Sequence, residues 1–367
     1  MKIELNNKKV FVILKDQKLE IHPFWLRERV QEENFLDKKT QQRLFDPASM
    51  DIQINILEAK LDGDFLKIKF NDGVNSILDI NKLSQEFSGK DTVIETLEKI
   101  KWKKNLSKLK NFEFRDNFFE SKEMYDLLIE FYKYGFVIIK KVPTKNNFII
   151  NFANSIGSVR RTNFGEYFNV KSKSDPNDLA YTSYGLTPHT DNPYRNPVPC
   201  IQILHCIENK VSGGYSTLVD GFTVTEDLKK INKDFYKILS ETKVRFRFID
   251  KDVVLENWSE LIILDENKKF KGVRFSTRLD YVPILDKKKL EIYYKARKNL
   301  SDLYNSEKYR IQFKLMPGDL LMMDNNRLLH GRTSYNSNEG NRFLQGCYID
   351  YDSTEGKLRH LKRKFKI

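Results

Sequence analysis

Cysteine is scarce in this sequence, which has three among 367 residues: Cys200, Cys206 and Cys347. Their spacing matches neither a thiolate metal site nor a disulfide framework. The sequence therefore excludes a disulfide-stabilised secreted scaffold and a zinc finger. Free thiols fit a reducing compartment, so we expect a cytoplasmic protein.

Long apolar stretches are also missing. No uninterrupted run approaches the ~20 residues that span a bilayer, and the segment Met1–Asn6 lacks the basic and apolar regions of a secretory signal. Glycine-rich phosphate loops are absent too, since Gly213-Gly214 predicts only a turn. We therefore expect no membrane partner, and nucleotide binding through a Walker or dinucleotide loop is excluded.

Acidic residues are outnumbered, because 64 Lys and Arg face 51 Asp and Glu and give a net charge of +13. One interpretation is a nucleic-acid or acidic-membrane partner. The other is compositional, since the lysines are spread along the chain and no nucleic-acid motif occurs. We favour the second and expect a small-molecule partner and no nucleic acid. A nucleic-acid-binding protein would instead show steeply salt-dependent retention on DNA.

The residues that are present predict two domains. Residues 1–97 are β-rich, as in Leu66–Phe70, where an alternating pattern leads into the turn signal Asn71-Asp72-Gly73. Residues 98–115 are basic and polar, which predicts a linker. Residues 116–367 form the predicted catalytic domain.

Short strands with glycine and proline between them dominate the predicted catalytic domain. Two helical stretches, Thr225–Glu241 and Lys287–Tyr304, interrupt them. The predicted strands include Ile201–Ile207, Thr217–Val219, Val244–Phe248, Leu261–Leu264, Val273–Phe275, Phe313–Leu315, Leu320–Met323 and Phe343–Ile349. This pattern predicts a mainly β fold with helices, of the sandwich or jelly-roll type, and argues against a parallel α/β sheet.

His189 and Asp191 are two positions apart, so on an extended strand both side chains lie on one face. A second histidine would complete two imidazoles and one carboxylate, the facial triad of non-haem Fe(II) oxygenases. His330 is the candidate, and it is expected in a short loop after a buried strand. Arg342 follows, and its guanidinium is suited to bidentate binding of a dicarboxylate. Because a bare His-x-Asp is common, the site depends on the fold bringing His330 to the pair.

The motifs His189-Thr190-Asp191, His330-Gly331-Arg332 and Arg342 resemble those of the Fe(II)/2-oxoglutarate dioxygenases of the taurine dioxygenase superfamily. Segments such as Gly213–Phe222 and Asp324–Arg332 are similar to its γ-butyrobetaine and trimethyllysine hydroxylases. The resemblance runs over roughly the whole chain. It implies a double-stranded β-helix, or jelly roll, preceded by a small β-rich domain.

The resemblance also implies the chemistry. His189, Asp191 and His330 would hold Fe(II), with 2-oxoglutarate and O2 as co-substrates. Arg342 would anchor the far carboxylate of 2-oxoglutarate, with Thr217 as a supporting hydroxyl. The implied reaction is hydroxylation of an unactivated C–H bond of a small quaternary-ammonium compound. The preferred example is the conversion of γ-butyrobetaine to carnitine. The alternatives are trimethyllysine, 2-(trimethylamino)ethylphosphonate and, remotely, a non-catalytic jelly-roll binding protein.

An aromatic cage for the substrate is implied as well, because a trimethylammonium group is attracted to π-faces. The matching positions are Phe164, Phe168, Tyr181 and Tyr348, and the alternative is that these are ordinary core aromatics. Asn192 stands where some members have an aromatic residue. Asp178 stands where some have an asparagine that helps to hold the substrate carboxylate. An acid there would repel an anionic end unless it is protonated or paired, and would favour an amino group, as in trimethyllysine.

The family's first domain often binds zinc through three cysteines. The matching positions here are Val30, Glu32 and Phe35, so we expect no structural zinc. Family members often pair, which implies a homodimer.

Overall fold

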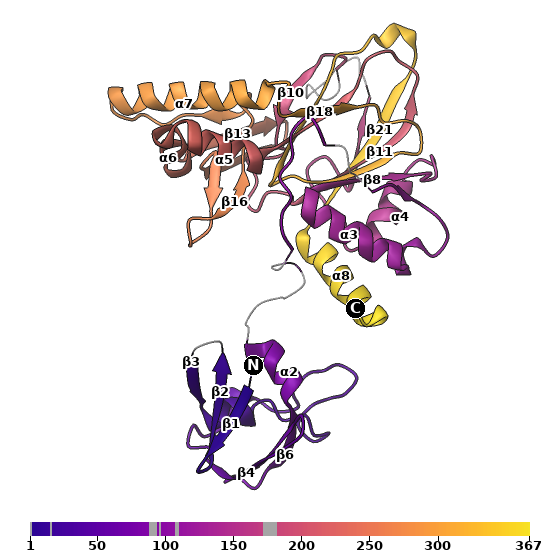
Figure 1. Cartoon of the computed structure of the whole chain (residues 1–367). Coiled ribbons are helices and arrows are strands. Elements are labelled where there is room, and N and C mark those ends of the chain that lie inside the picture. Colours follow the sequence, from indigo (N-terminus) through magenta and orange to yellow (C-terminus); the bar gives the residue numbers. More distant parts are fainter. Residues whose placement is uncertain (1, 15–16, 88–93, 95–96, 107–109, 172–181) are drawn as a thin grey trace. The chain divides into compact units, whose positions relative to one another are not determined.

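A computed structural model describes residues 2–14, 17–87, 94, 97–106, 110–171 and 182–367. The chain divides into two compact units, Met1–Glu95 and Thr96–Ile367 (Figure 1). None of the helices in the described residues is long and apolar enough to cross a membrane.

The first unit holds two antiparallel three-stranded sheets. They are built from β1 (Lys2–Asn6), β2 (Lys9–Leu14) and β3 (Gln17–Ile21), and from β4 (Ile56–Asp62), β5 (Phe65–Phe70) and β6 (Asn75–Asp79). The helices are α1 (Pro23–Arg27), the 3-10 helix η1 (Pro47–Ser49) and α2 (Ile80–Phe87). In β5, Leu66, Ile68 and Phe70 are buried in alternation, as the sequence predicts, and Gly73 takes a φ of +86° in the turn to β6.

The three positions considered above for zinc ligands have structural contacts in this unit. Val30 is buried in the core, and Phe35 packs against the same cluster. The Glu32 carboxylate accepts hydrogen bonds from Ser76 Oγ at 3.0 Å and from the Ile77 N–H at 3.1 Å. Val30 and Phe35 therefore pack in the core of this unit, and Glu32 is hydrogen-bonded to β6.

Two further sheets carry the second unit, with strand orders β7-β8-β19-β11-β21-β9 and β10-β20-β12-β18. Their neighbours are antiparallel except for β7 and β8. The six-stranded sheet comprises β7 (Phe112–Glu113), β8 (Phe136–Lys140), β19 (Leu320–Asp324), β11 (Ile201–Asn209), β21 (Arg342–Ile349) and β9 (Tyr167–Val170). The four-stranded sheet comprises β10 (Leu186–His189), β20 (Leu328–Arg332), β12 (Ser216–Asp220) and β18 (Arg310–Phe313). The prediction of a mainly β protein with helices is confirmed.

Helices pack against both sheets. The six-stranded sheet is contacted by α3 (Lys122–Tyr134) and α4 (Phe148–Asn154), and α8 (Tyr351–Phe365) lies on α3. The four-stranded sheet shares a core with α5 (Gly221–Ile231), α6 (Lys233–Glu241) and α7 (Lys287–Asn305). Short 3-10 helices lie at η2 (Phe118–Glu120) and η4 (Ser337–Glu339).

The single helix predicted over Thr225–Glu241 is wrong. The chain is extended at Asn232, with a φ of −152°, and this residue separates α5 from α6. Its side chain accepts hydrogen bonds from the N–H groups of Asp234 and Phe235. An asparagine in this role begins a new helix, which the apolar spacing alone does not reveal.

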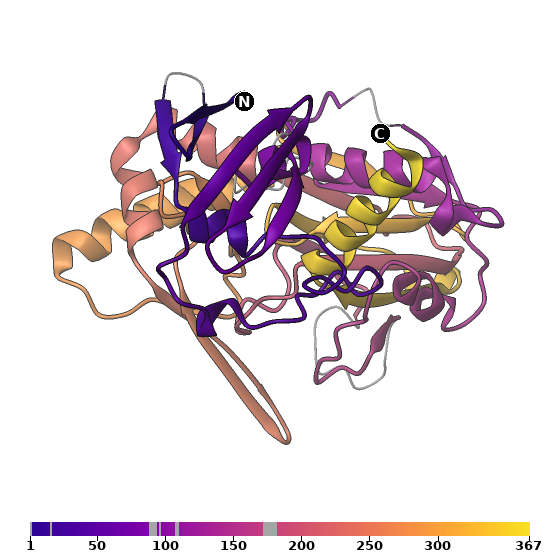
Figure 2. The same cartoon turned by 90° about the horizontal axis from the view of Figure 1, so that it is seen from below.

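Smaller sheets complete the second unit. They contain β13 (Val244–Asp250), β14 (Val253–Ser259) and β17 (Asp280–Tyr281) in one sheet, and β15 (Ile262–Leu264) and β16 (Phe270–Val273) in another. The hairpin of β13 and β14, salmon in Figure 2, projects from the rest of this unit. The strand predicted at Val273–Phe275 ends at Val273.

Part of the stretch predicted as a linker packs into the second unit. Trp102 is 4% exposed, its indole Nε1–H donates to the Tyr134 carbonyl at 2.8 Å, and its ring lies 5.5 Å from that of Phe136. Strand β7 adds to the edge of the six-stranded sheet. A basic, polar composition does not reveal this packing, because it depends on one tryptophan and two strand residues.

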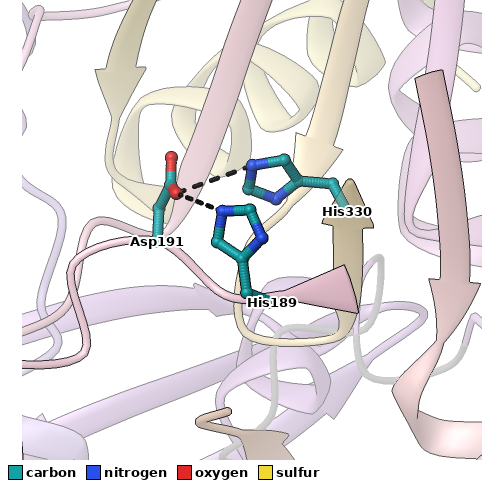
Figure 3. Close-up of side chains that lie close together, drawn as sticks. All are labelled: His189, Asp191 and His330. Carbon is teal, nitrogen blue, oxygen red and sulfur yellow. Dashed lines mark ion pairs between the residues drawn. The ribbon is translucent and has the colours of Figure 1, made fainter. Parts of the chain in front are cut away.

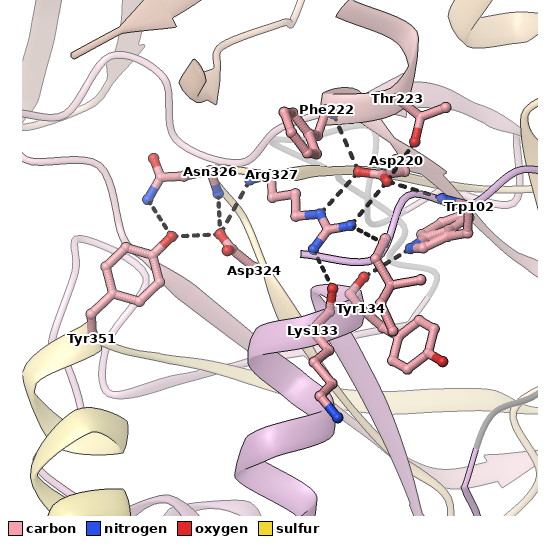
Figure 4. A network of polar contacts seen from close by, with 11 residues as sticks. Trp102, Lys133, Tyr134, Asp220, Phe222, Thr223, Asp324, Asn326, Arg327 and Tyr351 are labelled. Atoms are coloured by element: carbon pink, nitrogen blue, oxygen red, sulfur yellow. Dashed lines mark hydrogen bonds and ion pairs between the residues drawn. The ribbon is translucent and has the colours of Figure 1, made fainter. Parts of the chain in front are cut away.

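The turn Asn325–Arg327 carries the chain from β19 in one sheet to β20 in the other (Figure 4). The Arg327 guanidinium donates to both Asp220 carboxylate oxygens at 3.0 Å, and the two side chains are 3% and 0% exposed. It also donates to the carbonyls of Lys133 at 2.7 Å and Ile100 at 2.6 Å. This buried network fixes the turn three residues before His330.

Candidate functional site

All three predicted iron ligands meet where β10 and β20 lie side by side (Figure 3). His189 ends β10 and is the register partner of His330 on β20. The Nε2 atom of each imidazole lies 3.5 Å from Asp191 Oδ1. Among the described residues, this is the one group of three His, Cys, Asp or Glu side chains placed to share a metal ion. The expectation of a loop at His330 is wrong, since it lies within a strand.

Backbone contacts fix the direction of Asp191. Thr190 and Phe275 exchange two hydrogen bonds, from the Thr190 N–H to the Phe275 carbonyl at 2.8 Å and from the Phe275 N–H to Thr190 Oγ1 at 3.0 Å. Asn325 accepts from the Asp191 N–H at 2.8 Å and donates to the Asp191 carbonyl at 3.0 Å. Asn192 then takes a left-handed φ of 50°. Asp191 is therefore held from both sides.

The two carboxylate oxygens of Asp191 have different contacts. Tyr348 Oη–H donates to Oδ2 at 2.7 Å, and Gln202 Nε2–H donates to the same oxygen. Oδ1 remains toward the imidazoles. Such outer hydrogen bonds orient a metal-ligating carboxylate.

Electrostatics favour the protonation states that a metal needs. Burial opposes ionisation of Asp191, but the His330 and His189 imidazoles and the Tyr348 hydroxyl outweigh it and lower the pKa of this carboxyl. Burial lowers the pKa of His330 to about 4, so its ring is neutral at pH 7. His189 Nδ1 lies 2.9 Å from the Thr187 carbonyl, which favours a proton on Nδ1 and a free lone pair on Nε2.

A pocket beside these residues is lined from both sheets. The six-stranded sheet contributes Phe168, Val170, Gln202, Leu204, Arg342, Leu344 and Tyr348, and the four-stranded sheet contributes His189, Ser216, His330 and Arg332. Loop residues complete it, among them Phe164, Asn192, Ser276 and Arg278. Apolar and aromatic walls therefore lie beside a group of polar and charged side chains, a combination that suits a small polar molecule.

The two arginines of the pocket differ in what they contact. Arg332 donates to the Tyr184 and Thr182 carbonyls, so it ties β20 to the chain just before β10. Arg342 is 6% exposed, and its Nε and Nη1 have no hydrogen-bond partner in the described part of the chain. Its guanidinium lies against Gly214, where a Cβ would come within 2.9 Å of Nε. A buried guanidinium with unused N–H groups fits the carboxylate of 2-oxoglutarate.

Comparison with known proteins agrees with this geometry. A family model described as "Taurine catabolism dioxygenase TauD, TfdA family" matches residues 100–348. The chain belongs to this family. The prediction of an oxidoreductase of the 2-oxoglutarate-dependent type, with iron and 2-oxoglutarate as cofactors, is thereby confirmed.

Individual relatives are similar over different parts of the chain. The chain is 34% identical to the γ-butyrobetaine dioxygenase of Pseudomonas sp. (strain AK-1) over 62% of this chain and 60% of that one. It is 34% identical to human γ-butyrobetaine dioxygenase over 70% of this chain and 67% of that one. It is 28% identical to rat mitochondrial trimethyllysine dioxygenase over 92% of this chain and 82% of that one. The match therefore spans about 60% of the bacterial relative's length.

Solved structures also resemble this chain, and one example is an iron oxygenase. The non-heme iron oxygenase OrfP in complex with Fe and alpha-ketoglutaric acid is 14% identical, with a TM-score of 0.48 over 67% of this chain and 95% of that chain.

Within this dioxygenase, four of the predicted substrate residues are brought together. Phe164, Phe168, Asn192 and Tyr348 all line the pocket. The Phe168 and Tyr348 rings lie 5.4 Å apart at 32°, and Gly346 makes room for Phe168, whose ring would meet a Cβ at 2.4 Å. Tyr181 and Asp178 lie outside the described residues.

Thr217 does not line the pocket, and the adjacent Ser216 does. Ser216 pairs across the strands with Arg332, whereas Thr217 pairs with Gly331. Gly331 also lines the pocket, and Thr217 Oγ1 would lie 3.0 Å from a Cβ built at Gly331, so the Thr217 hydroxyl is next to the pocket wall. The role of Thr217 as a supporting hydroxyl for 2-oxoglutarate stays a prediction.

Several groups around the triad were not recognised from the sequence. No role was predicted for Asn325, Gln202 or Ser276. Asn325 lies within the segment Asp324–Arg332 that resembles the family, and it contacts Asp191 across 134 positions. One signal was available for Gln202, a polar side chain within the otherwise apolar run Ile201–Leu204. A buried polar residue in a strand needs a partner, and here the partner is Asp191.

Replacing Asn325 with alanine is expected to lower Fe(II) affinity about 10- to 100-fold, because outer contacts of this kind typically contribute that much. The substitution removes both hydrogen bonds to the Asp191 backbone. Anaerobic Fe(II) titration measures the effect. The control is Asn326→Ala, since the Asn326 side chain donates to Tyr351 instead. Equal iron affinities in the two variants would contradict the prediction.

Proposed function

We propose that this dioxygenase hydroxylates an unactivated C–H of a small quaternary-ammonium substrate, with γ-butyrobetaine as the first choice. The observation that carries the proposal is the triad itself, which opens onto an aromatic-lined pocket. The names of the relatives support the choice of substrate. We also infer that the two sheets of the second unit form a jelly roll.

Each residue has a distinct role in the proposal. His189, Asp191 and His330 would hold Fe(II). Arg342 pairs with the far carboxylate of 2-oxoglutarate. When bound, iron and 2-oxoglutarate supply, with O2, the oxidising power for the hydroxylation, and succinate and CO2 are released.

The aromatic residues orient the substrate. Tyr348 has two functions, because its hydroxyl holds Asp191 and its ring lies beside Phe168. A trimethylammonium group donates no strong hydrogen bonds, but aromatic faces attract it, more strongly where water is excluded. The rings therefore hold the cationic end and leave a methylene to face the iron.

A second candidate is trimethyllysine. The relative of that name aligns over 92% of this chain, a longer span than the γ-butyrobetaine enzymes. Asp178 would favour an amino group, and 2-(trimethylamino)ethylphosphonate remains a third possibility. The homodimer and the cytoplasmic location stay predictions.

Succinate release from the anaerobically iron-loaded protein tests the proposal. The panel contains γ-butyrobetaine, trimethyllysine, 2-(trimethylamino)ethylphosphonate and taurine. We expect one trimethylammonium compound to stimulate turnover, with taurine at the background rate. The matched control is 5,5-dimethylhexanoate, which has the shape of γ-butyrobetaine without its positive charge and should bind poorly.

Iron-dependent background turnover with no stimulation by any trimethylammonium compound would overturn the substrate class. Equal stimulation by the uncharged control would overturn the cage.

A further inference from the structure

A four-residue turn beside the triad presents two unused polar side chains to the pocket. Ser276 and Arg278 both line it. The turn is closed by a hydrogen bond from the Leu279 N–H to the Ser276 carbonyl at 3.0 Å. It follows Phe275 directly, and Phe275 is bonded twice to Thr190, the residue between two ligands of the triad. The turn is thus fixed to the iron site itself.

The far end of the turn is also anchored. The Arg247 N–H on β13 donates to the Leu279 carbonyl at 3.0 Å. Asp280 follows, and its carboxylate, 1% exposed, accepts from Arg297 Nη1 at 3.0 and 3.1 Å. The acid adjacent in sequence is therefore already paired and does not neutralise Arg278.

Neither polar group of the turn has a partner in the described residues. Ser276 is 3% exposed, and its hydroxyl makes no hydrogen bond there. Arg278 is exposed and makes no ion pair or hydrogen bond to any described side chain or backbone group. A buried hydroxyl without a partner is costly, so a ligand group at this position is favoured.

The charges of the pocket favour an anion at this place. Among the described residues that line it, Asp191 is the one carboxylate, against three arginines. Fe(II), Asp191, 2-oxoglutarate and Arg342 carry charges that cancel. Arg332 is engaged with carbonyl oxygens. Arg278 has no hydrogen-bond or ion-pair partner among the described residues, so its positive charge is available to an anionic ligand.

We propose that Arg278, with the Ser276 hydroxyl beside it, binds the anionic end of the substrate, a carboxylate or a phosphonate. The inference rests on the proposed function, and it makes the substrate a zwitterion whose cationic end is held by Phe168 and Tyr348. A guanidinium is suited to this task because it donates two parallel hydrogen bonds to such a group.

Arg278→Gln tests the assignment in the full-length, iron-loaded protein. Hydrogen bonds to charged groups are strong enough that we expect KM for the stimulating substrate to rise roughly 10- to 100-fold. KM for 2-oxoglutarate should not change, because Arg342 is the residue assigned to that co-substrate. The matched control is Arg363→Gln on the exposed side of α8, which removes the same charge away from the pocket.

The substrate's methyl ester provides the second arm. Wild type should bind the ester as poorly as Arg278→Gln binds the acid, and the variant should lose nothing further with the ester. Arg278→Lys keeps the charge without the paired donors, so it should retain a phosphonate better than a carboxylate.

The outcomes separate the two proposals. Wild-type protein that turns over no trimethylammonium compound overturns the proposed function and this inference with it. An active wild type whose Arg278→Gln variant keeps its KM, or loses affinity for acid and ester alike, overturns only the role of Arg278. A raised KM for 2-oxoglutarate would assign Arg278 to the co-substrate instead.

Discussion

His189→Ala is expected to abolish substrate-dependent turnover while the protein stays folded. A metal ion contributes several kcal/mol of catalytic stabilisation, and each 1.4 kcal/mol is worth about tenfold, so the rate should fall at least ~1,000-fold. His189 lines a pocket, so its truncation enlarges existing space and does not open a closed cavity in the core. Succinate release, anaerobic Fe(II) binding and circular dichroism measure the three consequences.

The matched control is His360→Ala, because that histidine is exposed on α8 and contacts Glu120 at 3.2 Å, outside the pocket. It should keep both iron binding and turnover. Normal activity in His189→Ala would refute the assignment of the triad, and a variant that binds iron but fails to turn over would move His189 from ligand to substrate contact.

Arg327→Met is expected to lower the free energy of unfolding by about 3–5 kcal/mol, since breaking a buried pair leaves an uncompensated charge. The charge left without its partner is that of the Asp220 carboxylate, whose side chain is 0% exposed. Two carbonyls, of Lys133 and Ile100, lose their donors as well. Urea unfolding at pH 7 measures the loss. The turn before His330 should also loosen, so iron affinity should fall in parallel.

Two variants sharpen this prediction. Arg327→Met with Asp220→Asn removes the stranded charge and keeps an acceptor for the start of α5, so part of the stability should return. Lys298→Met breaks an exposed pair with Asp302 and should cost about 1 kcal/mol or less. A change of that small size in Arg327→Met would show that the buried pair contributes little.

Local patterns predicted most of the elements because each depends on neighbours in sequence. The alternation of Leu66–Phe70 and the helical spacing of Lys287–Tyr304 appear as β5 and within α7. The helix break at Asn232 was missed, since a cap acts through one side chain and leaves the apolar period intact. His330 was expected in a loop, because the strand Leu328–Arg332 is short and includes a histidine, a glycine and an arginine.

The sequence by itself determined the reaction class, because the types and order of His189, Asp191, His330 and Arg342 specify an iron site and an anion site wherever the fold joins them. Only the tertiary structure decided which groups support that site. The pairing of β12 with β20 brought Ser216 to the pocket, and a turn far along the chain brought Asn325 to Asp191. The physical reason is that strand faces and cross-sheet turns set side-chain direction through contacts distant in sequence, and no local pattern encodes them.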